Sequence, residues 1–367
     1  MEERIPEGRN YQMDNLRCLL IFSVVFGHLL ELFMGSRGLD RILYLTIYSF
    51  HMPLFAFVSG VFAKFDPARI RGRMIYPYLI FQTLYICYAN IVLGKETDLQ
   101  YTTPYWLLWY LFATVAWNLA LPLVQARNMK AKAAMLLMAF AAAVMIGYDN
   151  RAGYYLSVSR IVEFFPFFLM GYYSRGMRES TKRLIGAVQS HRLKIFLAAF
   201  CTLFICLAVG VISSNEEDIR SVWLYGSSSY DNGDYGWRLR SVCMAVATAW
   251  LGFFLAVIPV KRVPFLSAAG AHTMTVYLLH GFFIRLLKEE RFFSKMENPV
   301  MAAFLVTCAL IAVLSAKPIQ KLFGPFLSLE EGRRALGRLR AAGAESRRCM
   351  EYAVRLRARW SRRGRPG

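Results

Sequence analysis

Ionisable side chains inside an apolar segment are the first sign of chemistry in this sequence. Arg17 and His28 are eleven positions apart, which is three helical turns plus roughly 20°, so both project from one face of a helix. At about 1.5 Å per residue, His28 lies roughly 16 Å farther along that helix than Arg17. Asp14 lies on nearly the same face, where we expect a bidentate ion pair with Arg17.

Each of these residues also has a simpler explanation. Arg17 alone is a common kind of snorkelling anchor at the headgroups. His28 alone is most often explained by a hydrogen bond between helices. Because Arg17 and His28 share one helix face, a functional role for both residues is favoured over two separate structural roles.

The second apolar segment carries His51 close to Pro53, followed by Ser59. Proline removes a backbone donor and frees a carbonyl one turn earlier, so the helix is expected to open near His51 and leave room for a polar pocket. The alternative is a packing kink with an incidental histidine.

Two further sets of polar residues are candidates for supporting roles. Tyr277 and His280 are three apart and therefore share one helix face, although such a pair also commonly satisfies itself between helices. Glu163 is expected either to bind a sugar hydroxyl or to pair with Arg160.

The chemistry available to such a cluster is narrow. A histidine has an ordinary pKa of roughly 6.5 and suits general-base work at neutral pH, such as deprotonating a sugar hydroxyl that attacks a thioester. A thioester donor with phosphates would bind at a basic mouth, for which the candidates are Arg69, Arg71 and Arg73. The sequence has no Walker loop, G-x-S-x-G or H-E-x-x-H motif, so we expect neither ATP-driven, esterase-like nor metal chemistry.

The elements that must position these residues are membrane helices. Hydrophobic residues make up 56% of the 367 residues and occur in blocks of roughly twenty, the length that crosses a bilayer. We therefore predict an all-α polytopic membrane protein of about ten transmembrane helices. The predicted segments are 16–35, 42–63, 75–94, 105–124, 131–148, 160–174, 193–213, 240–260, 268–288 and 299–323.

The distribution of charge predicts the orientation. The net charge is +20, but Lys and Arg concentrate in alternate connections and in the tail, which favours anionic membrane lipids as partners and argues against nucleic acid. The positive-inside rule then places both termini in the cytoplasm of a multi-pass protein of the cell membrane. In that orientation Arg17 lies near the cytoplasmic headgroups, and His28 and His51 lie near mid-membrane.

Two segments outside the apolar blocks also stand out. The connection 214–239 is rich in Ser, Gly, Tyr and Asp and is expected to be either a sugar-contacting loop or a solvated connector. The Arg-rich residues 328–367 form a predicted basic cytoplasmic tail beyond a transmembrane acyltransferase domain at 1–327. This tail is interpreted as a helix on the inner leaflet, with disorder as the alternative.

Several of these motifs together resemble one family. Asp14, Arg17 and His28 are similar to the first-helix signature of the acyltransferase-3 family of membrane acyltransferases. The segments 51–60 (HMPLFAFVSG), 106–111 (WLLWYL), 165–172 (FPFFLMGY) and 273–280 (TMTVYLLH) resemble the subgroup related to fucose 4-O-acetylases.

The resemblance implies a ten-helix fold and transfer of an acyl group, usually acetyl from acetyl-CoA, to an extracytoplasmic glycan or lipid-linked sugar. It implies a catalytic role for His28 and a supporting role for Arg17. Two Arg three apart often precede a Pro in the family's first cytoplasmic loop. Here Arg73 precedes Pro77, whereas Ile70 occupies the partner position.

The resulting hypothesis is an O-acetyltransferase in which His28 is the general base or carries the acyl group, and in which His51 or Ser59 bonds to the developing oxyanion. The alternative from another class is a carrier or flippase for a glycan or metabolite, in which the buried His and Glu form a binding or proton path. A third possibility is a sensor or scaffold without chemistry.

Overall fold

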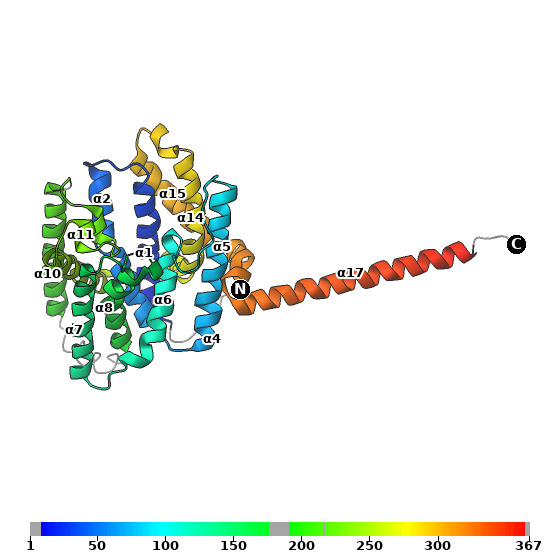
Figure 1. Ribbon diagram of the computed structural model, residues 1–367, viewed down its shortest axis with the longest axis horizontal. Coiled ribbons are helices and arrows are strands. Elements are labelled where there is room, and N and C mark those ends of the chain that lie inside the picture. The colour runs from blue at the N-terminus through cyan, green and yellow to red at the C-terminus, as the bar shows by residue number, and fades with distance from the viewer. Residues whose placement is uncertain (1–8, 154, 176–190, 216, 364–367) are drawn as a thin grey trace.

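The computed structural model describes residues 9–153, 155–175, 191–215 and 217–363, and every regular element within these ranges is helical. Figure 1 shows a bundle of helices from which one long C-terminal helix extends. The α-helices are α1 Tyr11–Leu30, α2 Leu39–Tyr48, α3 His51–Val61, α4 Pro67–Ile70, α5 Tyr76–Ile91, α6 Trp109–Ala120, α7 Met129–Met145, α8 Val158–Ser174, α10 His191–Ser214, α11 Tyr230–Gly233, α12 Trp237–Val257, α13 Pro264–Ala271, α14 Thr273–Glu289, α15 Pro299–Leu314, α16 Lys317–Leu327 and α17 Leu329–Arg363.

Each predicted apolar segment overlaps a helix, but several segments are broken into shorter pieces. Within the described residues, five continuous or nearly straight stretches are long and apolar enough to cross a membrane. A sixth candidate, α15 with α16, is bent by 72°. The total of about ten spans and the orientation of the termini remain predictions.

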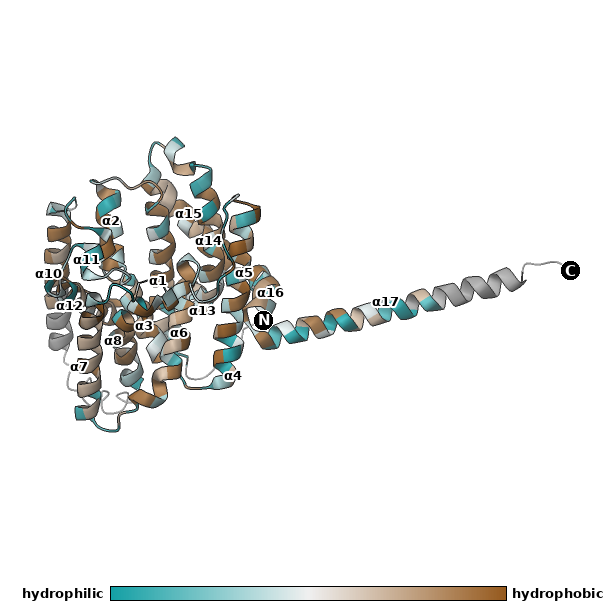
Figure 2. Cartoon of the chain, viewed as in Figure 1, coloured by the Kyte–Doolittle hydropathy of each residue, from teal (hydrophilic) through white to brown (hydrophobic). Residues whose placement is uncertain are grey.

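The outward faces of the bundle are apolar. Leu137 on α7, Leu207 on α10 and Leu305 on α15 expose 72%, 61% and 59% of their surface, and Figure 2 shows hydrophobic colour along most bundle helices. Water would not stabilise such faces, whereas lipid tails do. The chain is therefore a membrane protein.

Helix α1 is in the interior and holds the first candidate residues. It packs against α2, α3, α13, α14 and α15. It begins five residues earlier than the predicted segment 16–35, because the Asn10 side chain accepts a hydrogen bond from the Met13 amide as an N-cap. It also ends earlier, at Leu30, so His28 lies in its last turn rather than near its middle.

Helices α3 and α8 cross closely through two glycines. A Cβ atom at Gly60 would overlap the carbonyl of Phe168, and one at Gly171 would overlap the carbonyl of Phe57. Small residues at such positions let two backbones approach, which is a common way to pack membrane helices. This contact fixes α3, and with it His51 and Ser59, relative to α8.

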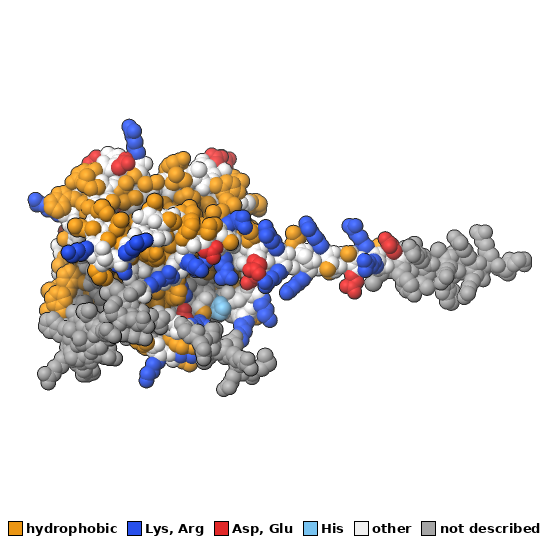
Figure 3. Space-filling view, turned by 90° about the horizontal axis from the view of Figure 1, so that it is seen from below, with side chains coloured by type: hydrophobic (Ala, Val, Ile, Leu, Met, Phe, Trp, Pro, Cys, Tyr) orange, Lys and Arg blue, Asp and Glu red, His pale blue; other side chains and the backbone are white. Residues whose placement is uncertain are grey.

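Helix α17 leaves the bundle crosswise to most of its helices (Figure 1). Ser328 separates it from α16, at the predicted boundary between residues 327 and 328. Seen from below in Figure 3, Lys and Arg side chains gather where α17 leaves the bundle and continue along it. Near its start, Tyr76 donates a hydrogen bond to the carbonyl of Pro325 at 3.0 Å, which holds the α16–α17 junction against the start of α5.

Candidate active site

His28 is surrounded by rings from three other elements, and only 15% of its side chain is exposed. Its ring centroid lies 4.8 Å from that of Trp106, 5.9 Å from that of His280 and 6.4 Å from that of Tyr48. Trp106 begins a short 3₁₀ turn, Trp106–Leu108, with φ at 39°. This region of backbone conformation is strained for a bulky residue, so the surrounding structure holds the indole against the imidazole.

The Nδ1 atom of His28 faces two polar side chains. Glu31 Oε2 lies at 3.4 Å and the hydroxyl of Tyr48 at 3.3 Å. Neither residue was among the candidates from the sequence. Glu31 carries a detectable signal, because it follows His28 by three positions and so lies on the same helix face.

His28 lines a cavity of about 250 Å³, which we call the histidine cavity. Its wall is mostly aromatic, and His51 of α3 also contributes to it. The full lining is Val24, His28, Glu31, Tyr48, His51, Met52, Phe55, Pro104, Trp106, Leu107, Trp109, Tyr110, Arg160, Leu224, Tyr225 and Tyr277.

Arg17 lines a second cavity of about 630 Å³, the arginine cavity. Arg69 and Arg73 also line it, whereas Arg71 is exposed and borders neither cavity. The rest of its wall is Phe55, Val58, Ser59, Phe62, Ala63, Met74, Tyr110, Leu111, Thr114, Asn118, Ala271, His272, Thr273, Met274, Thr275, Tyr277, Gln320, Leu327, Ser328 and Glu331.

The two cavities share three wall residues, Phe55, Tyr110 and Tyr277. We call this set the partition. The Tyr110 hydroxyl lies 2.7 Å from Ser59 Oγ, and Tyr277 donates to the carbonyl of Leu107. The partition therefore separates the part of α1 that carries Arg17 from the part that carries His28.

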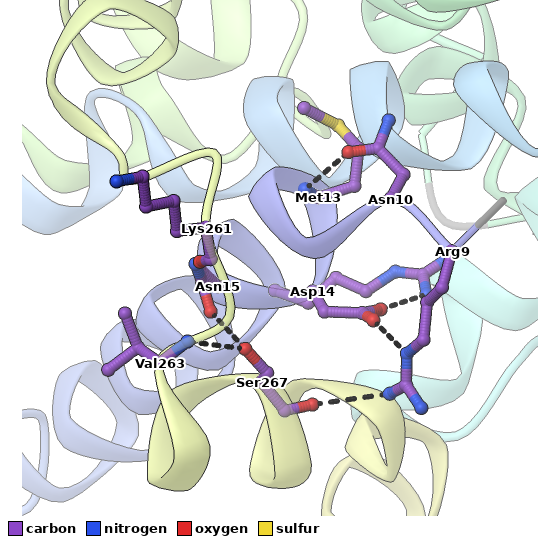
Figure 4. Close-up of polar contacts among 9 residues, drawn as sticks. Arg9, Asn10, Met13, Asp14, Asn15, Lys261, Val263 and Ser267 are labelled. Atoms are coloured by element: carbon purple, nitrogen blue, oxygen red, sulfur yellow. Dashed lines mark hydrogen bonds and ion pairs between the residues drawn. The ribbon is translucent and has the colours of Figure 1, made fainter. Parts of the chain in front are cut away.

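Arg17 is held differently from the prediction. Asp14 makes one contact with it, Oδ1 to Nη1 at 3.4 Å, rather than a bidentate pair. The other carboxylate oxygen accepts from Arg9 Nε at 2.6 Å (Figure 4). The Arg17 guanidinium also stacks over Phe62 at 4.1 Å from the ring centre. Because Asp14 is shared, donors of Arg17 remain directed toward the arginine cavity.

His51 and His280 each have their tautomer set by a backbone carbonyl. Each places Nδ1 2.9 Å from the carbonyl four residues earlier, Ile47 and Val276 respectively. A carbonyl only accepts, so each Nδ1 carries the proton and each Nε2 is an acceptor in the neutral ring. Nε2 of His280 is buried and has no partner among the described residues. Tyr277 and His280 are 6.3 Å apart by ring centroid and donate to different carbonyls, so they do not satisfy each other.

Glu163 lies away from both cavities. It pairs with Arg240 of α12 at 3.2 Å, both side chains being almost fully buried, rather than with Arg160 as expected. Arg160 instead donates from Nε to the Tyr225 carbonyl at 3.1 Å and lies over Trp109 at 4.9 Å. This arrangement places Arg160, and not Glu163, at the histidine cavity.

The described part of the connection 214–239 borders the histidine cavity. It contributes Leu224 and Tyr225 to the histidine cavity, and the Tyr225 hydroxyl is 2.5 Å from that of Tyr44. Composition alone did not indicate this role, because the contacts come from elements far away in the sequence.

The arrangement suits an anionic ligand on one side of the partition and a neutral polar one on the other. Arg17, Arg69 and Arg73 offer cationic donors for phosphates. The aromatic wall of the histidine cavity offers flat surfaces with a few polar groups, as ligand pockets commonly do. In the ranges that the structure describes, no group of three or more His, Cys, Asp or Glu side chains is arranged to hold a metal ion.

Comparison with known families assigns the class of protein. Residues 10–316 match the acyltransferase domain family, which covers most of the chain and includes α1 to α15. The protein belongs to this family and is a membrane acyltransferase. No curated protein and no solved structure matches the chain.

Proposed function

We propose that the protein moves an acyl group, most simply acetyl, from acyl-CoA to a hydroxyl of an extracytoplasmic or lipid-linked sugar. The observation that carries the proposal is the pair of cavities that meet at Phe55, Tyr110 and Tyr277. One cavity has the cations that a phosphorylated donor needs. The other has a histidine beside space for an alcohol.

The donor binds in the arginine cavity of the proposed enzyme. Its phosphates lie at Arg69 and Arg73, its pantetheine arm extends toward the partition, and Arg17 orients it. The cations at this mouth favour a cytoplasmic position for the cavity under the positive-inside rule. The acceptor enters the histidine cavity from the opposite side.

The chemical step in this proposal moves one acyl group and one proton. His28 takes the proton of the acceptor hydroxyl, the oxygen attacks the thioester carbon, and the carbon–sulfur bond breaks. The thiolate of CoA then receives the proton. In the variant mechanism, His28 itself is acylated first and passes the group to the alcohol. In both, the two reactants meet at the partition, which borders both cavities.

His51 is a weaker candidate for stabilising the oxyanion than the sequence indicated. Its neutral Nε2 is an acceptor, whereas a developing oxyanion needs donors. The hydroxyls of Ser59 and Tyr110 are better candidates for binding the oxyanion, because hydroxyls can donate and the two lie together at the partition.

The test is turnover by purified protein carrying His28→Ala. Loss of a positioned general base is expected to reduce acyl transfer by about 10²- to 10⁴-fold, while thermal stabilisation by acyl-CoA persists because the arginine cavity is intact. Near wild-type transfer would contradict the role of His28. Accumulation of acyl-protein from acyl-CoA without acceptor, lost in the variant, would favour the covalent mechanism.

A carrier or flippase is the second candidate, because two cavities separated by a thin partition are also what alternating access requires. Labelled sugar would then accumulate in vesicles without any acyl donor. The proposed enzyme instead predicts no accumulation and a gain of one acyl unit on the acceptor, measured by mass spectrometry.

The setting follows the same reasoning. The proposed location is the cell membrane, with anionic lipids as partners of the basic α17 on the inner leaflet. Binding of the full chain and of a chain ending at Ser328 to vesicles with and without anionic lipid would measure the contribution of α17 to lipid binding.

A further inference from the structure

Glu31 is the acidic residue closest to His28, and among the described residues it is the only acid that lines the histidine cavity. It follows the last residue of α1, and its backbone N–H bonds to the carbonyl of Gly27. This bond keeps the chain helical for one more residue and directs the carboxylate back toward His28. The resulting separation from Nδ1 is 3.4 Å.

Two neighbours of Nδ1 imply opposite proton positions. A carboxylate can only accept, so contact with Glu31 requires a proton on Nδ1 and leaves Nε2 free as a base. The Tyr48 hydroxyl lies 3.3 Å from the same atom. If this hydroxyl donates to Nδ1, the ring proton is on Nε2, and Nε2 cannot act as a base. The role of His28 thus depends on which neighbour sets the tautomer.

We propose that Glu31 is the positioning residue of His28: it holds the proton on Nδ1 and stabilises the imidazolium that forms when Nε2 accepts the proton of the acceptor. This inference rests on the proposed acyl transfer. It follows the general arrangement in which a carboxylate orients a catalytic imidazole through its second nitrogen.

The charge state of Glu31 supports this role. Burial raises the pKa of the Glu31 carboxyl. The hydrogen bond with His28 and the positive charges of His28, Lys288 and Arg285 lower this pKa by more than burial raises it, so the pKa lies below its ordinary value. The carboxylate is therefore ionised at neutral pH. The other titratable or charged groups that face His28 or line its cavity are Tyr48 of α2, His51 of α3, Tyr110 of α6, Arg160 of α8, Tyr225, and Tyr277 and His280 of α14, with Arg285 beyond Trp106.

The first arm of the test is kinetic. Glu31→Gln is expected to lower kcat about 100-fold with little change in KM for acyl-CoA, because the donor lies in the other cavity. Glu31→Asp keeps the charge and should recover part of kcat. Glu290→Gln is the matched control, since it removes an exposed carboxylate after the end of α14 and should leave both constants unchanged.

The second arm does not depend on turnover. Histidine side-chain NMR of the full protein in lipid nanodiscs, assigned with His28→Ala among its five histidines, reports the tautomer of His28. With Glu31 present we expect the proton on Nδ1. In Glu31→Gln the tautomer with the proton on Nε2 should gain population, since a neutral amide holds the Nδ1 proton less strongly than a carboxylate does. Tyr48→Phe should leave the tautomer unchanged.

The outcomes separate the two claims. If His28 shows the same tautomer populations with and without the Glu31 carboxylate, or if Tyr48→Phe and not Glu31→Gln changes the tautomer, the inference is wrong whatever the activity. If the NMR result holds but the wild-type protein transfers no acyl group, the proposed function is wrong while the His28–Glu31 pair stands.

Discussion

At the scale of single residues, the important distinction is between side chains that line the cavities and those that only lie near them in sequence. Arg69, Arg71 and Arg73 carry the same charge and lie close together in the sequence. The structure separates them, because α4 continues into a π-helical turn, Arg71–Ile75, that directs Arg73 into the arginine cavity. Arg69 also enters that cavity and donates to the Phe62 carbonyl at 3.1 Å.

This difference gives a paired prediction for the donor site. Arg73→Ala should weaken acyl-CoA binding by about 1.5 to 3 kcal/mol, the usual contribution of a charged hydrogen bond, which is roughly 10- to 100-fold. Arg71→Ala should change binding less than threefold. Titration calorimetry with acyl-CoA measures both, and equal effects of the two variants would remove the reason for assigning phosphates to this cavity.

The residues that could be predicted from sequence are those whose signal lies within one helix. His28 and Arg17 were found because their spacing placed them on one face. Trp106, Arg160 and Tyr225 were missed as partners of the site, because each reaches the cavity from a separate element and only tertiary packing brings them together. The ion-pair partner of Glu163 was missed for the same reason, since Arg240 is on α12.

At the scale of elements, the α3–α8 crossing is a contact that tolerates no added side-chain atom. Gly60 and Gly171 lie in segments that the sequence marked by family resemblance, and the structure adds a physical reason: neither position has room for a methyl group. The break between α2 and α3 falls at Ser49 and Phe50, directly before His51. Pro53 predicted an opening in this region.

The crossing can be tested by adding one methyl group. Gly60→Ala should lower the free energy of unfolding by about 1 to 3 kcal/mol or more, because overpacking against backbone cannot be relieved by a rotamer change. Gly210→Ala on α10, where no atom lies within 4 Å of the added Cβ, should be neutral or stabilising by up to about 1 kcal/mol. Thermal unfolding in detergent compares the two, and similar losses would argue against a tight crossing.

At the scale of the whole molecule, the sequence predicted the helical class and the membrane, because composition and block length report both directly. The number of spans is harder to derive. The long apolar blocks 42–63, 268–288 and 299–323 are each divided between two helices, and hydropathy averages over such breaks. The early start of α1 was missed because the Asn10 cap lies outside the apolar block.

The proposed orientation leads to a labelling prediction. In a variant without its native cysteines, a cysteine at Glu96 should react with an impermeant maleimide added outside intact cells, and one at Asn128 should react only after permeabilisation. The positive-inside rule sets these sides. The reverse pattern would place the arginine cavity outside and separate it from a cytoplasmic donor.

The thin partition also has an electrical consequence. If water fills both cavities in the proposed orientation, most of the membrane potential drops across the layer formed by Phe55, Tyr110 and Tyr277. A proton passed from the acceptor side to the departing thiolate would cross that layer, and a full crossing at 100 mV is worth about 2.3 kcal/mol. The three aromatic rings would then act as an insulator that keeps ions from leaking and makes acyl transfer respond to voltage.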